Sequence, residues 1–218
     1  MNDITLDYPD WYIVDSENTR PEWDYKPCNR SYAHNWVDDH PYPDCIAKIT
    51  KNIFLAAGLD ILKPKNFLYF DSWFKNNNIQ LIISATNLVG VSEHLRDLDV
   101  EFYELELEKI RPGKYSTDIN DYISIFNVFD DVYELYKKFV EDGNILIYCK
   151  AGQDRSVLIL LSILLNIQLE NMEYPDVEGN LTYIKNFKQD AGTTETKRLI
   201  NTLNKYVDYK IQGIYGFG

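Results

Sequence analysis

The sequence predicts an α/β domain with a largely parallel central sheet flanked by helices. Apolar runs at 81–85 and 145–148 have the length and composition of buried strands. Stretches with helical spacing of apolar residues separate the strand-like runs from one another. Strands that alternate with helices usually form a parallel sheet with the helices packed on its faces. The length of 218 residues fits one domain of roughly 100 to 200 residues with a short addition.

The predicted domain begins after an irregular segment. Residues 1–43 are acidic and rich in aromatic residues, with no helical or alternating period, and we expect them to form an N-terminal extension. The domain then spans 44–210, and 211–218 form a C-terminal tail. Within the domain, the segment 46–58 predicts a short strand pair that is closed by Gly58.

The next elements follow from local patterns. Apolar residues from 67 to 74 recur at helical spacing after Pro64, which the first turn of a helix tolerates. The segment 100–107 alternates apolar and acidic residues, and a change of register within it predicts a β-bulge. Capping residues at 116–118 predict the start of a long helix that ends near Gly143.

Three further helices complete the domain. The run 156–169 is apolar on nearly every side, which predicts a helix at the centre of the fold. Weaker amphipathic patterns predict helices near 181–190 and 194–208. The longest apolar stretch, 157–165, is far shorter than the ~20 residues that cross a bilayer, and the acidic start of the chain lacks the features of a secretory signal. We therefore expect a cytoplasmic protein that is not integral to a membrane.

Charge and cysteine content narrow the expected partners. The formal net charge is -12, from 34 acidic and 22 basic residues, and this opposes the phosphate contacts that drive nucleic-acid binding. Cys28, Cys45 and Cys149 show neither metal-ligand nor CxxC spacing. This pattern is typical of a reducing compartment, and it predicts neither a metal site nor a cofactor.

The most informative segment reads CKAGQDRS, at 149–156, between the strand 145–148 and the central helix. Backbone N–H groups at a helix N-terminus lack internal partners and carry about half a positive charge, so a tight loop there can bind a phosphate. Gly152 permits the sharp turn, and Arg155 offers a planar fork of donors that matches two phosphate oxygens.

The same groups favour nucleophilic chemistry at Cys149. Helix N-termini and nearby cations stabilise the thiolate, which is the reactive form of a cysteine. We expect the thiolate to attack phosphorus while the loop stabilises charge on the phosphoryl oxygens. Water then releases the phosphate from sulfur.

The pattern Cys-x5-Arg-Ser with a central glycine resembles the signature loop of the cysteine-based protein tyrosine phosphatase superfamily. The segment ITKNIFLAAG and the order of elements from about 45 to 208 are similar to the dual-specificity phosphatase domain. The resemblance implies a metal-independent phosphatase that acts on phosphotyrosine, phosphoserine or phosphothreonine in proteins, or on a small phosphoester. It implies Cys149 as nucleophile and Ser156 as the hydroxyl that assists departure of the thiolate. The implied phosphate-binding residues are Lys150, Ala151, Gly152, Gln153, Asp154 and Arg155.

Two positions bear on whether the chain is catalytic. The family usually has histidine directly before the cysteine, where this chain has Tyr148. The family also places an aspartate upstream of the cysteine to protonate the leaving oxygen. Asp118, which lies 31 positions before Cys149, is our first candidate for this acid, and Asp121 and Glu108 are lesser ones. Asp118 is equally suited to cap the following helix.

Asp154 is a second candidate for the acid. A lysine directly after the cysteine and an aspartate directly before the arginine resemble the loops of some phosphoinositide phosphatases, including the myotubularin type, in which that aspartate is the acid. Lys150 then binds a second phosphate group or points to solvent, whereas Gln153 in place of a second lysine favours a phosphoprotein. Two alternatives stay open, a phosphoinositide phosphatase and a phosphate-binding pseudophosphatase.

Overall fold

The computed structural model describes residues 46–58, 73–87, 95–107, 116–188, 191–192 and 196–215. The predicted N-terminal extension and most of the helix predicted after Pro64 lie outside these residues. The elements are, in chain order, β1 (Ile46–Lys48), β2 (Ile53–Ala57), β3 (Ile79–Ser84), β4 (Glu101–Glu104), the 3-10 helix η3 (Ile119–Tyr122), α5 (Ile123–Phe139), β5 (Asn144–Cys149), α6 (Arg155–Glu170), α7 (Val177–Phe187) and α8 (Thr196–Tyr215).

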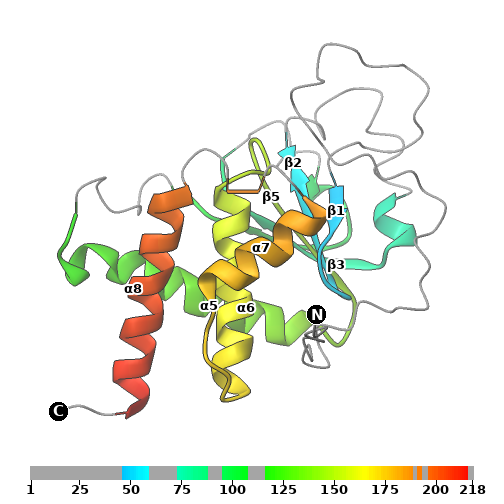
Figure 1. Ribbon diagram of the computed structural model, residues 1–218. Coiled ribbons are helices and arrows are strands. Elements are labelled where there is room, and N and C mark those ends of the chain that lie inside the picture. The colour runs from blue at the N-terminus through cyan, green and yellow to red at the C-terminus, as the bar shows by residue number, and fades with distance from the viewer. Residues whose placement is uncertain are drawn as a thin grey trace, which may run out of the picture.

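The described strands form one five-stranded sheet in the order β1-β2-β5-β3-β4. The strands β2, β5, β3 and β4 run parallel, and β1 pairs antiparallel with β2. Figure 1 shows α5, α6, α7 and α8 gathered beside the sheet. The predicted α/β class, with a largely parallel sheet and flanking helices, is confirmed, and so is the strand pair at 46–58.

The segment 100–107 does not contain the predicted β-bulge. The four residues of β4 pair with β3 in continuous register, and the chain then leaves the strand to bury Leu105 and Leu107 in the core. The change of pattern at 100–107 therefore marks the end of a strand, and the prediction of a bulge there is wrong. The register shift of the sheet lies between β3 and β5, near Leu81.

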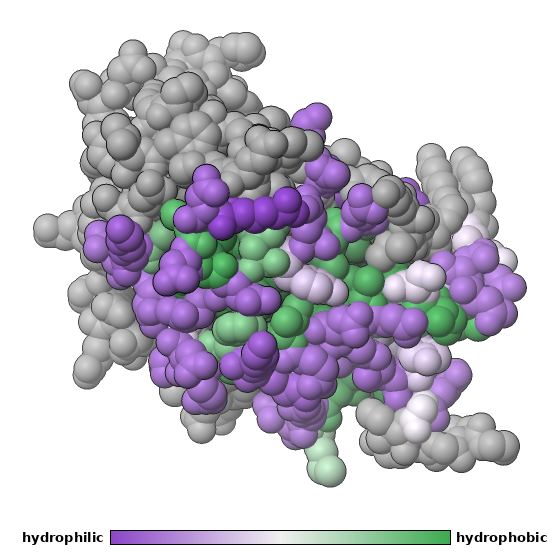
Figure 2. Space-filling model, turned by 180° about the vertical axis from the view of Figure 1, so that it is seen from behind, coloured by the Kyte–Doolittle hydropathy of each residue, from purple (hydrophilic) through white to green (hydrophobic). Residues whose placement is uncertain are grey.

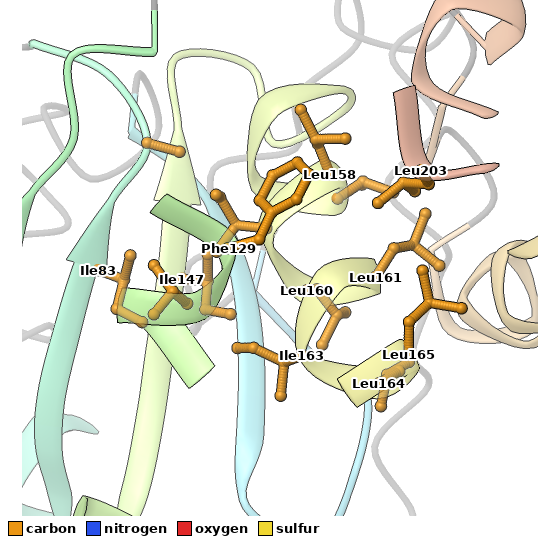
Figure 3. Packing of buried hydrophobic residues seen from close by; sticks show 14 of the residues in the cluster. Ile83, Phe129, Ile147, Leu158, Leu160, Leu161, Ile163, Leu164, Leu165 and Leu203 are labelled. Carbon is orange, nitrogen blue, oxygen red and sulfur yellow. The ribbon is translucent and has the colours of Figure 1, made fainter. Parts of the chain in front are cut away.

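Helix α6 forms the centre of the helical layer, as its apolar composition predicts. It contacts α5, α7, α8 and the strand β5, and its residues 157–165 are all buried. In Figure 3, Ile83 and Ile147 of the sheet lie on one side of α6 and Leu203 of α8 lies on the other. A helix with partners on every side has no polar face, because each of its faces is removed from water.

The outer helices agree with the sequence in type and differ in their limits. The predicted long helix consists of η3 followed by α5. Helix α8 extends to Tyr215, so 211–215 of the predicted tail are helical. Ile211 is partly buried against the main hydrophobic cluster, so the body of the protein contacts the helix at this position. None of the described helices is long and apolar enough to cross a membrane.

Successive side chains of β5 pack alternately into two different hydrophobic clusters. Ile147 and Cys149 belong to the large cluster that includes the helices, and Leu146 and Tyr148 belong to a smaller cluster on the other face of the sheet. This alternation follows from the two-residue period of a strand.

Figure 2 shows the side of the molecule opposite to that in Figure 1, where hydrophilic residues, with hydrophobic ones between them, cover much of the described surface.

Candidate active site

Cys149 ends the central strand β5 and is almost fully buried. Its Sγ accepts a hydrogen bond from the backbone N–H of Gly152, with N and Sγ 3.2 Å apart. The Oγ of Ser156 lies 3.3 Å from the same sulfur. An N–H three residues ahead can point back at the sulfur only if the loop curls over the end of the strand. The loop therefore surrounds the thiol rather than running extended.

Gly152 is required by the shape of this loop. Its φ is +67°, a conformation that glycine adopts without the steric cost that a Cβ imposes. A Cβ at this position would also lie 2.9 Å from the carbonyl oxygen of Ala56. The end of β2 thus backs directly onto the loop, and both the backbone conformation and the available space favour glycine.

The N-terminus of α6 faces the loop. The helix begins at Arg155 with Asp154 as its N-cap residue, and the side chain of Asp154 makes no capping hydrogen bond. The first N–H groups of a helix have no partners within the helix, and its dipole places partial positive charge at this end. Ser156, in the first turn, is fully buried beside the thiol.

The side chain of Arg155 is held by a residue just after β3. Its Nη1 donates a hydrogen bond of 2.7 Å to the Oγ1 of Thr86. Arg155 is half-buried, and this burial lowers the pKa of its guanidinium. Thr86 is a site residue that was not predicted from the sequence. The one indication in the sequence is its place just after the predicted strand 81–85, because the carboxyl ends of parallel strands meet at one edge of a sheet.

A second support comes from the turn between α7 and α8. The backbone N–H of Gly192 donates to the carbonyl oxygen of Gln153, with N and O 2.6 Å apart. Gly192 also has a positive φ, of 64°. No local pattern in the sequence connects Gly192 to the loop, and the contact arises only when α7 and α8 pack against α6.

The remaining loop residues differ in their exposure. Lys150 is exposed, whereas Ala151, Gln153 and Asp154 are partly buried. The loop thus presents one solvent-exposed cation at its rim and keeps its other side chains closer to the body of the protein. Among the described residues, no group of three or more His, Cys, Asp or Glu side chains is arranged to hold a metal ion.

Asp118 lies at the start of η3, where it is exposed and acts as a helix cap. Its Oδ1 accepts hydrogen bonds of 2.9 Å from both the backbone N and the side-chain Nδ2 of Asn120. Asp121 is also exposed and accepts a hydrogen bond from Ser116. Glu108 lies outside the described residues. Of the candidate acids in the described part of the chain, Asp154 is the one within the loop itself.

Tyr148 lies directly before the cysteine but on the other face of the sheet. It is fully buried in the smaller cluster, together with Phe54, Phe74 and Leu146. Cys149 belongs to the larger cluster on the helical face. The tyrosine ring and the thiol therefore project from opposite faces of β5, and the ring fills space in the smaller core.

Comparison with known proteins places this fold. No protein-family model matches the sequence, and no curated protein matches it. A mouse protein described as a dual specificity phosphatase, in complex with zinc tungstate, has a TM-score of 0.55 at 13% identity, over 84% of this chain and 96% of that one. Human DUSP28 with a tyrosine replaced by histidine has a TM-score of 0.53 at 10% identity, over 78% and 98% of the two chains.

A third solved structure is PTPMT1 in complex with PI(5)P. It has a TM-score of 0.53 at 14% identity, and the match covers 77% of this chain and 99% of that one. The matches cover almost the whole of each of the three solved chains, so this chain contains all of the fold that they share. The chain has the fold of the dual-specificity phosphatases, which confirms this part of the predicted architecture.

Replacing Gly152 with alanine tests the geometry of the loop. We expect Gly152→Ala to lower the free energy of unfolding by about 1 to 3 kcal/mol, because a non-glycine residue is strained at this φ, and to weaken binding of tungstate, a tetrahedral dianion. Gly213→Ala in α8 is the matched control. Its Cβ has open space in the described structure, and alanine favours a helix. Thermal unfolding with and without tungstate measures both effects, and a Gly152→Ala protein that matches the wild type would contradict this geometry.

Proposed function

We propose that this protein is a cysteine-dependent phosphatase that hydrolyses phosphotyrosine, phosphoserine or phosphothreonine through a cysteinyl-phosphate intermediate. The observation that carries the proposal is the Gly152 N–H directed at the sulfur of Cys149 from 3.2 Å. The curled backbone, the N-terminus of α6 and Arg155 bring positive charge to one place, and a phosphate dianion above the sulfur would be bound there.

In the first step the thiolate of Cys149 attacks phosphorus. The S–P bond forms and the P–O bond of the ester breaks, and the leaving oxygen takes a proton from a general acid. The loop amides and the Arg155 guanidinium bind the other three phosphoryl oxygens, on which charge is spread in the transition state. These groups come from the chain itself, so the proposed reaction needs no metal ion.

In the second step water attacks phosphorus and the S–P bond breaks. The sulfur leaves as a thiolate, and inorganic phosphate is the product. Ser156 lies 3.3 Å from this sulfur, where its hydroxyl can donate a hydrogen bond to the departing anion. The hydrogen bond from Gly152 stabilises the same charge, so the enzyme returns to its starting form with the thiolate supported from two sides.

Replacement of Cys149 is the direct test of the nucleophile. The wild-type protein is expected to hydrolyse p-nitrophenyl phosphate in excess chelator, and Cys149→Ser and Arg155→Ala are each expected to lower kcat/KM at least about 1,000-fold, as removal of a nucleophile or its partner does elsewhere. Cys28→Ser, which also removes one thiol, is the matched control and should retain activity.

Two outcomes would contradict this proposal. Activity that survives Cys149→Ser would remove the assigned nucleophile. Saturable phosphopeptide binding by the wild type, lost in Arg155→Ala but accompanied by no burst of phosphate at high protein concentration, would identify a phosphate-binding pseudophosphatase instead.

Asp118 and Asp154 are the two proposed general acids, and different observations support them. The position of Asp118 upstream of the cysteine supports it, although its carboxylate is engaged in capping Asn120. The place of Asp154, in the loop directly before Arg155, supports it instead. An acid on the loop would be carried to the leaving oxygen by the same backbone that binds the phosphate.

Leaving-group dependence separates the two acids. General acid catalysis contributes ~10² to 10⁴ in rate, so replacing the true acid by asparagine should cost this much on a phosphoserine peptide and much less on p-nitrophenyl phosphate, whose leaving group needs no proton. Asp118→Asn keeps the cap, because asparagine caps as well as aspartate. Asp142→Asn, at an exposed aspartate between α5 and β5, serves as the control. Equal losses on both substrates for Asp118→Asn and Asp154→Asn would contradict both assignments.

A phosphoinositide is the second candidate substrate. Lys150 is exposed directly beside the nucleophile, where it can contact a second phosphate group, and PTPMT1, which shares the fold, has been solved in complex with PI(5)P. A protein substrate remains our first choice, because Gln153 supplies no second cation next to the pocket.

Lys150→Gln distinguishes the two substrate classes. If lipids are substrates, this change should lower kcat/KM for a soluble bisphosphorylated phosphoinositide about fivefold, since an ion pair in high dielectric contributes about 1 kcal/mol, and leave p-nitrophenyl phosphate hydrolysis unchanged. Lys138→Gln is the control, because Lys138 is exposed at the end of α5 that leads into the start of β5, away from Cys149. Hydrolysis of phosphopeptides without hydrolysis of the phosphoinositide would contradict the proposal of a lipid substrate.

A further inference from the structure

Thr86 occupies a fixed position at the edge of the sheet where the candidate loop lies. It follows β3 by two residues, and it is almost fully buried. The Oγ of Ser84 donates a hydrogen bond of 2.6 Å to the carbonyl oxygen of Thr86. The backbone N–H of Ala85 donates to the carbonyl oxygen of Tyr148 at 2.8 Å. The turn that carries Thr86 is therefore tied to β5 one residue before the nucleophile.

The hydroxyl of Thr86 holds the guanidinium of Arg155. The Nη1 to Oγ1 distance of 2.7 Å is short for a hydrogen bond between nitrogen and oxygen. The two residues are 69 positions apart in the sequence, so only the folded sheet brings them together. A guanidinium that is half removed from water needs such acceptors, because an unpartnered buried cation is costly.

The chemistry of the acceptor matters for an anion-binding site. A carboxylate in this place would also orient the arginine, but it would neutralise the positive charge and compete with phosphate for the guanidinium. A hydroxyl accepts one N–H and carries no charge. Thr86 can therefore help to fix the plane of the guanidinium without adding a negative charge beside it.

We propose that Thr86 is a positioning residue that orients Arg155 for bidentate binding of the substrate phosphate. The inference rests on the proposed function of the same loop, and it adds a residue from the turn after β3 to the machinery. Two parallel N–H···O bonds form only if the guanidinium plane is aligned with the phosphate. Without the hydroxyl, the guanidinium loses the contact with Thr86 that aligns it, and affinity and rate both fall.

The test compares variants that differ in this hydroxyl. Thr86→Val keeps the branched shape and removes the acceptor, and we expect it to raise the Kd of tungstate, measured by titration calorimetry, about 10-fold to 100-fold and to lower kcat/KM to a similar extent. Thr86→Ser restores a hydroxyl and should bind tungstate nearly as well as the wild type. Thr202→Val is the matched control, because Thr202 is equally buried and its hydroxyl donates within α8 to the Arg198 carbonyl oxygen.

A double-mutant cycle shows whether Thr86 acts through Arg155. In an Arg155→Lys background the planar fork is already absent, so Thr86→Val should change tungstate affinity much less than it does in the wild type. Equal effects in the two backgrounds would assign Thr86 a role that does not pass through Arg155, and this would overturn the inference. If Thr86→Val does not fold, Thr86→Ala removes the same hydroxyl without adding volume and gives the same readout.

The outcomes separate the two proposals. Unchanged tungstate affinity in folded Thr86→Val, or an equal loss in Thr86→Ser, overturns the positioning role. A wild-type protein that binds tungstate but releases no phosphate from p-nitrophenyl phosphate or phosphopeptides contradicts the proposed hydrolysis. The ratio of the tungstate affinities of wild type and Thr86→Val still decides the role of Thr86. A wild-type protein that does not bind tungstate overturns both.

Discussion

The arrangement of this site depends on one contact, the hydrogen bond from the Gly152 N–H to the sulfur of Cys149. It fixes the direction in which the loop curls, and it aims a backbone donor at the sulfur of the proposed nucleophile. The positive φ of Gly152 and the close approach of Ala56 make glycine necessary there. A single backbone conformation thus links the packing of β2 against the loop to the chemistry proposed for the thiol.

The fold supplies rigid supports on each side of that loop. The strand β5 is central, so its last residue is flanked by β2 and β3, and α6 starts immediately beyond the loop in the middle of the helical layer. Thr86 holds Arg155 from the end of β3, and Gly192 holds the Gln153 carbonyl from the turn between α7 and α8. Both supports are uncharged, so neither of them adds a negative charge to the loop.

The sequence predicts the parts of the site whose structure depends on residues that are adjacent in the chain. The strand, loop and helix around Cys149 and Arg155 are contiguous, and their apolar runs and glycine identify them. Thr86 lies 69 residues from the arginine it contacts, so its place after a predicted strand indicates the edge of the sheet but not the contact. Gly192 is joined to the loop only by helix packing and carries no local signal. The sequence alone does not decide between two roles for Asp118, a helix cap and a general acid. Its residue type predicts the cap that forms, whereas an acid role depends on where the substrate lies.

A crystal structure of the wild-type protein with tungstate is the sharpest test of the curled loop as an oxyanion site. We expect the oxyanion inside the curled loop, with its oxygens bonded to the backbone amides and to both terminal nitrogens of Arg155, and with tungsten in line with the sulfur of Cys149. Tungstate bound outside the loop, or a loop whose amides turn away from the anion, would contradict it.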